Sequence, residues 1–132
     1  MNASPSGIGI TRLGQIAINV RDLDRATAFY RDALGLTFLF TAPPAMTFFD
    51  CGGVRLMLAR AEKPEFDHPT SILYFAVPDI TVAHRRLADI GVRFEAPPHL
   101  VAPMSTYDLW MGFFRDSEDN LMALMSEVPR NM

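Results

Sequence analysis

The sequence predicts an α+β fold made of two tandem β-α-β-β-β units. Residues 14–36 combine a short strand pattern, a helix pattern and a closing glycine. Gly52-Gly53 separates two β-prone runs, which is a strong signal for a tight hairpin. The second half of the chain then repeats the order of the first. Because there are only two copies, and each is longer than fifty residues, the repeat indicates paired units within one domain and not a solenoid.

The first unit opens with a strand and a capped helix. Ile16, Ile18 and Val20 alternate with smaller or more polar residues, which is the period of a strand with two different faces. Asp22 is a candidate N-cap, because its carboxylate can accept hydrogen bonds from the first turn of a helix. Gly35 is placed to end that helix. The residues that share one face of the helix are Ala26, Phe29, Tyr30, Ala33 and Leu34.

Three further strands complete the first unit. The β-prone runs 36–40, 46–50 and 54–58 are interrupted by Ala42-Pro43-Pro44 and by the glycine pair. Residues 61–70 carry charges and two prolines, so they are predicted to be a linker between the units.

The second unit follows the same plan. Asp79 precedes a second helix pattern as Asp22 precedes the first, and Gly91 ends it. Ala96-Pro97-Pro98 repeats the earlier Ala-Pro-Pro run at the corresponding point. The strands predicted in this unit are 72–77, 92–95, 108–114 and 121–126.

Length and composition limit the kinds of protein that fit. The 132 residues, just under half of them hydrophobic, suit one domain with a real core. We expect a flexible arm over residues 1–11 and one domain over 12–128, with modules at about 13–60 and 71–128 joined by the linker 61–70. The net charge of −3 provides no excess of basic residues for binding nucleic acid. Cys51 is the only cysteine, so the chain cannot form an internal disulfide, which favours a reducing compartment. No run of residues suits a membrane span or a secretion signal. A soluble cytoplasmic protein is therefore predicted.

The chain also resembles a known family, the vicinal oxygen chelate superfamily of glyoxalases, bleomycin-resistance proteins, epimerases and extradiol dioxygenases. The resemblance covers about residues 13–128. It is carried by Asp22-Leu23, Phe29-Tyr30 and Leu34-Gly35, and by the late run Phe113-Phe114-Arg115-Asp116 that leads to Asn120. Ser117 and Asp119 depart from the family pattern, which commonly has Pro and Gly there. The resemblance implies that the two sheets curve around a cup, with the helices outside, and that the chain forms a homodimer.

The resemblance also implies where a metal would be held. Enzymes of the family bind a divalent cation on four inward-facing side chains, which here are Gln15, Met57, Ile72 and Ala123. A neutral amide is a weak ligand, a thioether is too soft for most of these metals, and the other two side chains offer no donor. We therefore predict no metal and no cofactor, and the loss of the metal-based chemistry of the family.

What remains is a cup of mixed character, as expected for a small-molecule pocket. Arg55 is the residue that says most about the ligand, because a guanidinium facing an apolar cavity favours an anionic or carbonyl partner. Alternatively, Arg55 pairs with Asp50 or lies at the rim. For Trp110 the sequence allows stacking on a flat ligand, packing in the core or packing in a dimer interface. For His99 it allows a place near the mouth of the cup or the role of an ordinary loop histidine. The residues predicted to bind a ligand are Gln15, Asn19, Arg55, Met57, Ile72, Tyr74, His99, Trp110, Ala123 and Met125.

Three functions fit these observations. The first, which we favour, is a metal-free protein of the glyoxalase/bleomycin-resistance type that binds a small anionic or aromatic molecule in its cup. The second is an enzyme, such as a glyoxalase-like lyase, epimerase or dioxygenase with an atypical site. It would hold a metal on unforeseen ligands or use His99, Tyr74 or Arg55 for acid–base chemistry. The third is an interaction module whose cup has collapsed into a core. No catalytic residue is assigned, and neither nucleic acid nor a membrane is expected as a partner.

Overall fold

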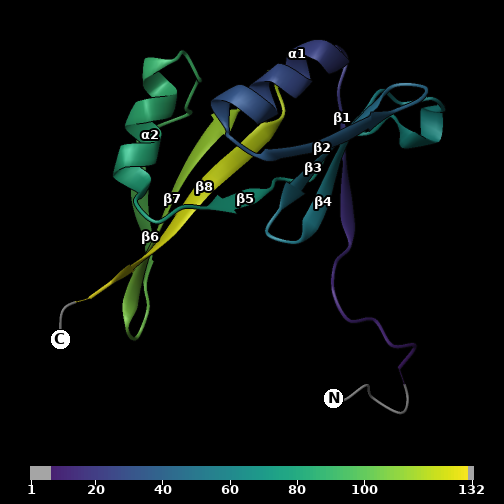
Figure 1. Ribbon diagram of the computed structural model, residues 1–132. Helices are drawn as coiled ribbons and strands as arrows, with labels where there is room; N and C mark the ends of the chain where they lie inside the picture. Colours follow the sequence, from purple (N-terminus) through teal and green to yellow (C-terminus); the bar gives the residue numbers. More distant parts are fainter. Residues whose placement is uncertain (1–6, 131–132) are drawn as a thin grey trace.

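The computed structural model describes residues 7–130 and shows an α+β fold of two similar modules (Figure 1). This confirms the predicted fold class. The elements of the first module are β1 (Gln15–Asn19), α1 (Leu23–Ala28), the π-helix η1 (Phe29–Ala33), β2 (Thr37–Ala42), β3 (Met46–Cys51) and β4 (Val54–Ala59), and a short 3₁₀ helix η2 (Pro64–Phe66) follows. The elements of the second module are β5 (Tyr74–Ala76), α2 (Ile80–Asp89), β6 (His99–Pro103), β7 (Tyr107–Arg115) and β8 (Leu121–Pro129).

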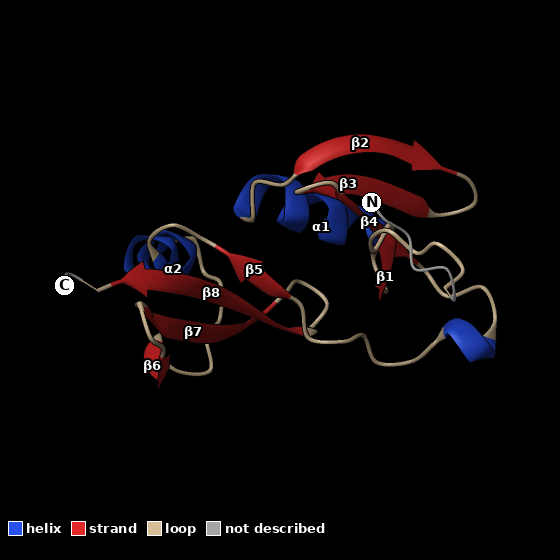
Figure 2. Ribbon diagram, turned by 90° about the horizontal axis from the view of Figure 1, so that it is seen from below, coloured by secondary structure: helices blue, strands red, loops and turns tan. Residues whose placement is uncertain are grey.

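Each module forms its own four-stranded mixed sheet. The strand orders are β1-β4-β3-β2 and β5-β8-β7-β6, so the two sheets have the same topology. The first strand of each module pairs in parallel with the last, and the remaining pairs are antiparallel. Figure 2 shows α1 and α2 each lying behind its own sheet. We call the opposite side of each sheet its open face, because neither α1 nor α2 covers it.

The hydrophobic core lies on the helix side and is shared by the two modules. Ile18, Tyr30 and Phe49 of the first module belong to the same buried cluster as Phe114 and Leu124 of the second. Their strand residues alternate with residues of the open faces, which is the pattern expected when one side of a sheet packs and the other does not. The two modules therefore share one core.

Both helices begin as the sequence predicted. The Asp22 carboxylate accepts a hydrogen bond from the Arg25 backbone N–H at 3.0 Å, and that of Asp79 accepts one from the Val82 N–H at 3.1 Å. The two helices end differently. After α1 the chain widens into a π-helical turn, in which the N–H of Leu34 donates to the carbonyl of Phe29 at 3.0 Å. No sequence pattern indicated this turn.

The loop between β7 and β8 joins the two modules. The Tyr30 hydroxyl donates to the buried Asp116 carboxylate at 2.7 Å, and burial together with this carboxylate raises the pKa of Tyr30 well above 10.0. Glu118 is also buried. It accepts hydrogen bonds from the Arg25 side chain and from the backbone N–H groups of Arg21 and Asp22, all at 2.8–3.1 Å. This loop therefore fastens the start and the last turn of the first helix to the second module.

One predicted strand is wrong. Residues 92–95 form only an isolated bridge, from Phe94 to Phe114, and the strand that pairs with β7 is His99–Pro103, beyond the two prolines. Pro97 and Pro98 have no N–H to donate, so they interrupt the edge of the sheet. Pro98 instead packs against Gly112, where an added Cβ would lie 3.3 Å from the proline ring. The interruption leaves β6 as the edge strand.

The predicted N-terminal arm is described only in part, because residues 1–6 lie outside the described residues. Residues 7–14 contain neither helix nor strand, and Ile8 and Ile10 are 91% and 81% exposed. Within residues 7–130, no helix is both long and apolar enough to cross a membrane.

Candidate functional site

The open face of the first sheet carries a polar cluster from β1 and β4. Gln15 and Arg55 are partners in the parallel register, and Ala17 is paired with Met57. The Arg55 Nε donates to the Gln15 Oε1 at 2.9 Å, and the Gln15 Nε2 donates to the Met57 Sδ at 3.7 Å. The alternation of β1 and β4 placed these three side chains together, as the sequence predicted.

Arg55 lies over an aromatic surface and keeps part of its guanidinium free. Its Cζ is 5.4 Å from the centroid of the Phe48 ring, which stacks on Phe40 with centroids 4.5 Å apart. Asp50 lies opposite Arg55 in the register of β3 and β4. Yet among residues 7–130 no carboxylate lies within 4.0 Å of Arg55, and its two terminal nitrogens have no hydrogen-bond acceptor. The guanidinium can therefore bind an incoming anion or carbonyl at its fork.

A hollow of about 260 Å³ adjoins this cluster. Its wall is completed by the linker after β4, because the Asn19 side-chain amide donates to the carbonyls of Phe66 and His68 at 2.7 and 2.6 Å. Asn19 was predicted to bind a ligand, and here its N–H groups hold the linker over the hollow. The residues lining the hollow include Ala17, Asn19, Met46, Met57, Ala59, Phe66 and His68.

The open face of the second sheet is apolar and aromatic. Tyr74 and Phe113 meet edge to face, with centroids 5.8 Å apart, on either side of Ala123. Ala123 is fully buried beneath them, so this face presents the two rings and not the alanine. Met125 lies beside them, opposite Met111, and His99 pairs with Met111 from the edge strand.

The predicted residues are thus divided between two sheets. Gln15, Asn19, Arg55 and Met57 lie on the first, and Tyr74, His99, Ala123 and Met125 lie on the second. Ile72 precedes β5 and is 39% exposed.

Trp110 is not brought to either open face. It packs against the core and lines a hollow beside the start of α2, because the period of β7 places it with Phe114 and not with Phe113.

Sequence reasoning missed the aromatic floor under Arg55 and the folded linker. Phe48 could have been found, because the hairpin at Gly52-Gly53 sets the register that places it opposite Met57 on the open face. Phe66 and His68 could not, since they reach the site only through the hydrogen bonds of Asn19.

The side chains at the four positions expected for a metal do not fit one. Ile72 and Ala123 carry no donor atom, and the Gln15 amide is engaged by Arg55 and Met57. A positively charged guanidinium 2.9 Å from the Gln15 oxygen also disfavours a second cation there. Over residues 7–130, no three His, Cys, Asp or Glu side chains lie together in a way that would hold an ion.

Comparison with known proteins places this chain in a family. Residues 12–124 match the model of the Glyoxalase/Bleomycin resistance protein/Dioxygenase superfamily. The chain belongs to this superfamily, and the resemblance seen in the sequence is confirmed. Among curated proteins, no sequence match was found.

Solved structures with the same fold include proteins of different kinds. The structure of TnmS3, an antibiotic binding protein from Streptomyces sp. CB03234, has a TM-score of 0.73 and 19% identity, and the match covers 92% of this chain and 99% of that one. A lactoylglutathione lyase from Agrobacterium tumefaciens has a TM-score of 0.67 and 21% identity, with 89% and 95% covered. A superfamily member from Sphaerobacter thermophilus has a TM-score of 0.71 and 20% identity, with 89% and 98% covered. At these identities the likeness concerns the fold alone.

Proposed function

We propose that the protein binds a small organic molecule on its open faces and does so without a resident metal. The ligand is an aromatic molecule that carries an anionic or strongly polarised oxygen. The observation that carries this proposal is the geometry of Arg55, whose guanidinium lies over the Phe48 ring with both terminal nitrogens free of described protein partners.

The two open faces are complementary in what they offer a ligand. The first supplies one cation and the amide of Gln15, while the second supplies the rings of Tyr74 and Phe113 and the thioether of Met125. Flat rings pack well on aromatic and thioether groups, and an oxygen anion binds a guanidinium fork. TnmS3, which is described as an antibiotic binding protein and has this fold, supports small-molecule binding as a use of the architecture.

We propose further that the protein acts as a homodimer in the cytoplasm. Two of the four edge strands expose large apolar side chains: Phe38, Leu39 and Phe40 on β2 are 41–44% exposed, and Leu100 and Val101 on β6 are 46% and 47% exposed. Exposed apolar edges are commonly covered by another chain. Cys51, a free thiol, suits a reducing compartment. Light scattering coupled to size exclusion should give twice the chain mass, and the mass of one chain would contradict the dimer.

Titration calorimetry with 2-naphthoate tests the proposed ligand class. We expect binding by the wild type and at least tenfold weaker binding by Arg55→Met, because the guanidinium provides the only charge-assisted hydrogen bonds proposed for the carboxylate. Arg31→Met, which alters an exposed arginine paired with Asp32, is the matched control and should bind as the wild type does. Equal binding by the Arg55 variant would remove the basis of the proposal.

Elemental analysis tests the metal-free part independently. Protein purified without chelators should contain much less than one equivalent of zinc, nickel, manganese or iron. One equivalent that survives dialysis, and that is lost in Gln15→Ala, would favour a metalloenzyme instead.

A further inference from the structure

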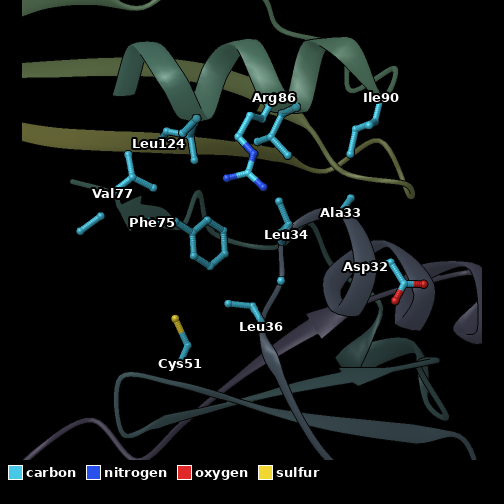
Figure 3. A pocket seen from close by; sticks show the side chains of 14 residues that line it. Asp32, Ala33, Leu34, Leu36, Cys51, Phe75, Val77, Arg86, Ile90 and Leu124 are labelled. Atoms are coloured by element: carbon cyan, nitrogen blue, oxygen red, sulfur yellow. The ribbon is translucent and has the colours of Figure 1, made fainter. Parts of the chain in front are cut away.

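A second cavity lies on the helix side of the sheets, and Arg55 is not among its lining residues. It has a volume of about 560 Å³ and is formed where the end of the first helix meets β5, β8 and α2 (Figure 3). Phe75, Val77 and Leu124, which line it, belong to the helix-facing residues of the second sheet. The cavity therefore lies mainly on the side of the second sheet opposite its open face, and it is also lined by Ala76 of the edge strand β5.

The wall of this cavity is mainly aliphatic. Leu34 and Leu36 enter it from the first module, and Leu87 and Ile90 enter it from α2. Ile90 is 62% exposed, so the cavity opens to solvent beside an apolar rim. Phe75 is the only aromatic residue in the lining. Such a wall favours a flexible hydrocarbon chain over a flat ring system.

Arg86 supplies the one positive charge in the cavity lining, and this charge is not paired with an acid that the structure describes. Figure 3 shows its guanidinium extending from α2 into the space between Leu34 and Phe75. Within residues 7–130 no carboxylate lies within 4.0 Å of it and no hydrogen bond engages it. Asp32, the only acid in the lining, is already held by Arg31 through two hydrogen bonds of 2.9 and 3.1 Å.

The backbone at the end of the first helix departs from α-helical geometry where it lines the cavity. An α-helical turn would join the N–H of Leu34 to the carbonyl of Tyr30, but that carbonyl instead accepts from the N–H of Leu36 at 3.0 Å. The π-turn and Gly35, whose φ is +73°, end the helix at this point, and Leu34, Gly35 and Leu36 line the cavity. π-Turns within helices often occur at functional sites.

We propose that this cavity is a second ligand site, which binds an aliphatic carboxylate of medium chain length. Its carboxylate would bind the Arg86 guanidinium, and its hydrocarbon chain would lie against Leu34, Leu87 and Phe75. This site does not depend on the open-face site, because none of its lining residues belongs to the cluster around Arg55.

Cys51 provides a reporter for this site. It is the only cysteine of the chain, lies in the cavity wall and is only partly buried. A ligand that fills the cavity should therefore slow the reaction of the Cys51 thiol with a reagent such as dithiobisnitrobenzoate.

The test uses the full chain with octanoate, followed by calorimetry and by the rate of thiol labelling. We expect octanoate to bind and to slow labelling at least threefold, and octanamide, which has the same length without the charge, to bind at least tenfold more weakly. Arg86→Met should weaken octanoate binding at least tenfold, while Arg86→Lys should retain part of it. Arg85→Met, the neighbouring exposed arginine outside the cavity, should behave as the wild type.

Three results would overturn the proposal: no octanoate binding by the wild type, unchanged binding by Arg86→Met, or octanoate binding without protection of Cys51. Arg55→Met separates the two sites, because it should weaken naphthoate binding at least tenfold and leave octanoate binding unchanged. Loss of octanoate binding in Arg55→Met would place that ligand on the open face instead.

Discussion

The two modules differ most in the contact that the loop of one makes with the helix of the other. In the first module β3 and β4 are joined by the tight turn at Gly52 and Gly53, whereas in the second β7 and β8 are joined by the longer loop of residues 116–120. The longer loop reaches α1 and buries Asp116 and Glu118 against it. The short turn begins after Cys51, which lines the cavity beside α2.

The first and second helices carry different residues at one equivalent position. Tyr30 is eight residues after Asp22, and Leu87 is eight residues after Asp79, so they occupy equivalent positions. Tyr30 carries the hydroxyl that binds Asp116, while Leu87 has none and lines the cavity. In the first module this position makes a contact between the modules, whereas in the second module it lines a cavity. The first helix thus carries the contact between the modules, and the second lines the cavity proposed as a ligand site.

Asp116→Ala should cause the largest loss of stability, because it breaks the contact between the longer loop and the first helix. The substitution removes the acceptor of the Tyr30 hydroxyl and of the backbone N–H groups of Glu118 and Asn120. Buried donors left without partners are costly, so we expect the free energy of unfolding to fall by about 4 kcal/mol. Urea unfolding followed by circular dichroism measures it.

The matched control is Asp50→Ala, which alters the acid next to the short turn of the first module. Its side chain forms no hydrogen bond or ion pair with any residue that the structure describes, so a change below about 0.5 kcal/mol is expected. Similar losses in the two variants would show that the longer loop has no special role.

Glu118 should make the second largest contribution, and one that depends on pH. Burial alone would raise the pKa of Glu118, but hydrogen bonds from Arg25 and from the backbone N–H groups of Asp22 and Arg21 outweigh it, so the pKa falls from 4.5 to about 2. Because the folded state favours the ionised carboxylate, this stabilisation is complete above about pH 4.5 and is lost as the pH falls towards 2. At pH 7 we expect Glu118→Gln to lower the free energy of unfolding by about 3 kcal/mol.

Urea unfolding at a series of pH values separates this charge effect from a packing effect. The difference between wild type and Glu118→Gln should shrink steadily from pH 5 to pH 2. A difference that stays constant over this range would mean that the loop depends on the shape of Glu118 and not on its charge.

The sequence predicted those features that depend on neighbouring residues. The N-caps at Asp22 and Asp79 and the hairpin at Gly52-Gly53 were found because each is set by a few adjacent residues. Alternation in β1 and β4 also placed Arg55 on the open face beside Gln15. The fold class followed from these local signals repeated in the same order.

The features it missed depend on residues far apart in the chain. The hydrogen bond from Tyr30 to Asp116 spans 86 positions, and those from Asn19 to Phe66 and His68 depend on how the linker folds back. The strand after Pro98 was missed for a related reason, because the edge of a sheet depends on the neighbouring strand. Whether a strand residue lines an open cup or is buried by rings beside it, as Ala123 is, also depends on that packing.

Asp119→Gly should give the smallest effect, and in the opposite direction. In the longer loop Asp119 adopts a φ of 66°, whereas the short turn of the first module has glycine at its positive φ values of 61° and 91°. Aspartate in this conformation is strained, and its exposed ion pair with Arg93 contributes little. We therefore expect Asp119→Gly to raise the free energy of unfolding by about 0.5 kcal/mol. Arg93→Ala, which removes the pair and keeps the backbone, should change it by less than about 0.5 kcal/mol, so a larger loss in either variant would mean that the loop relies on this surface pair.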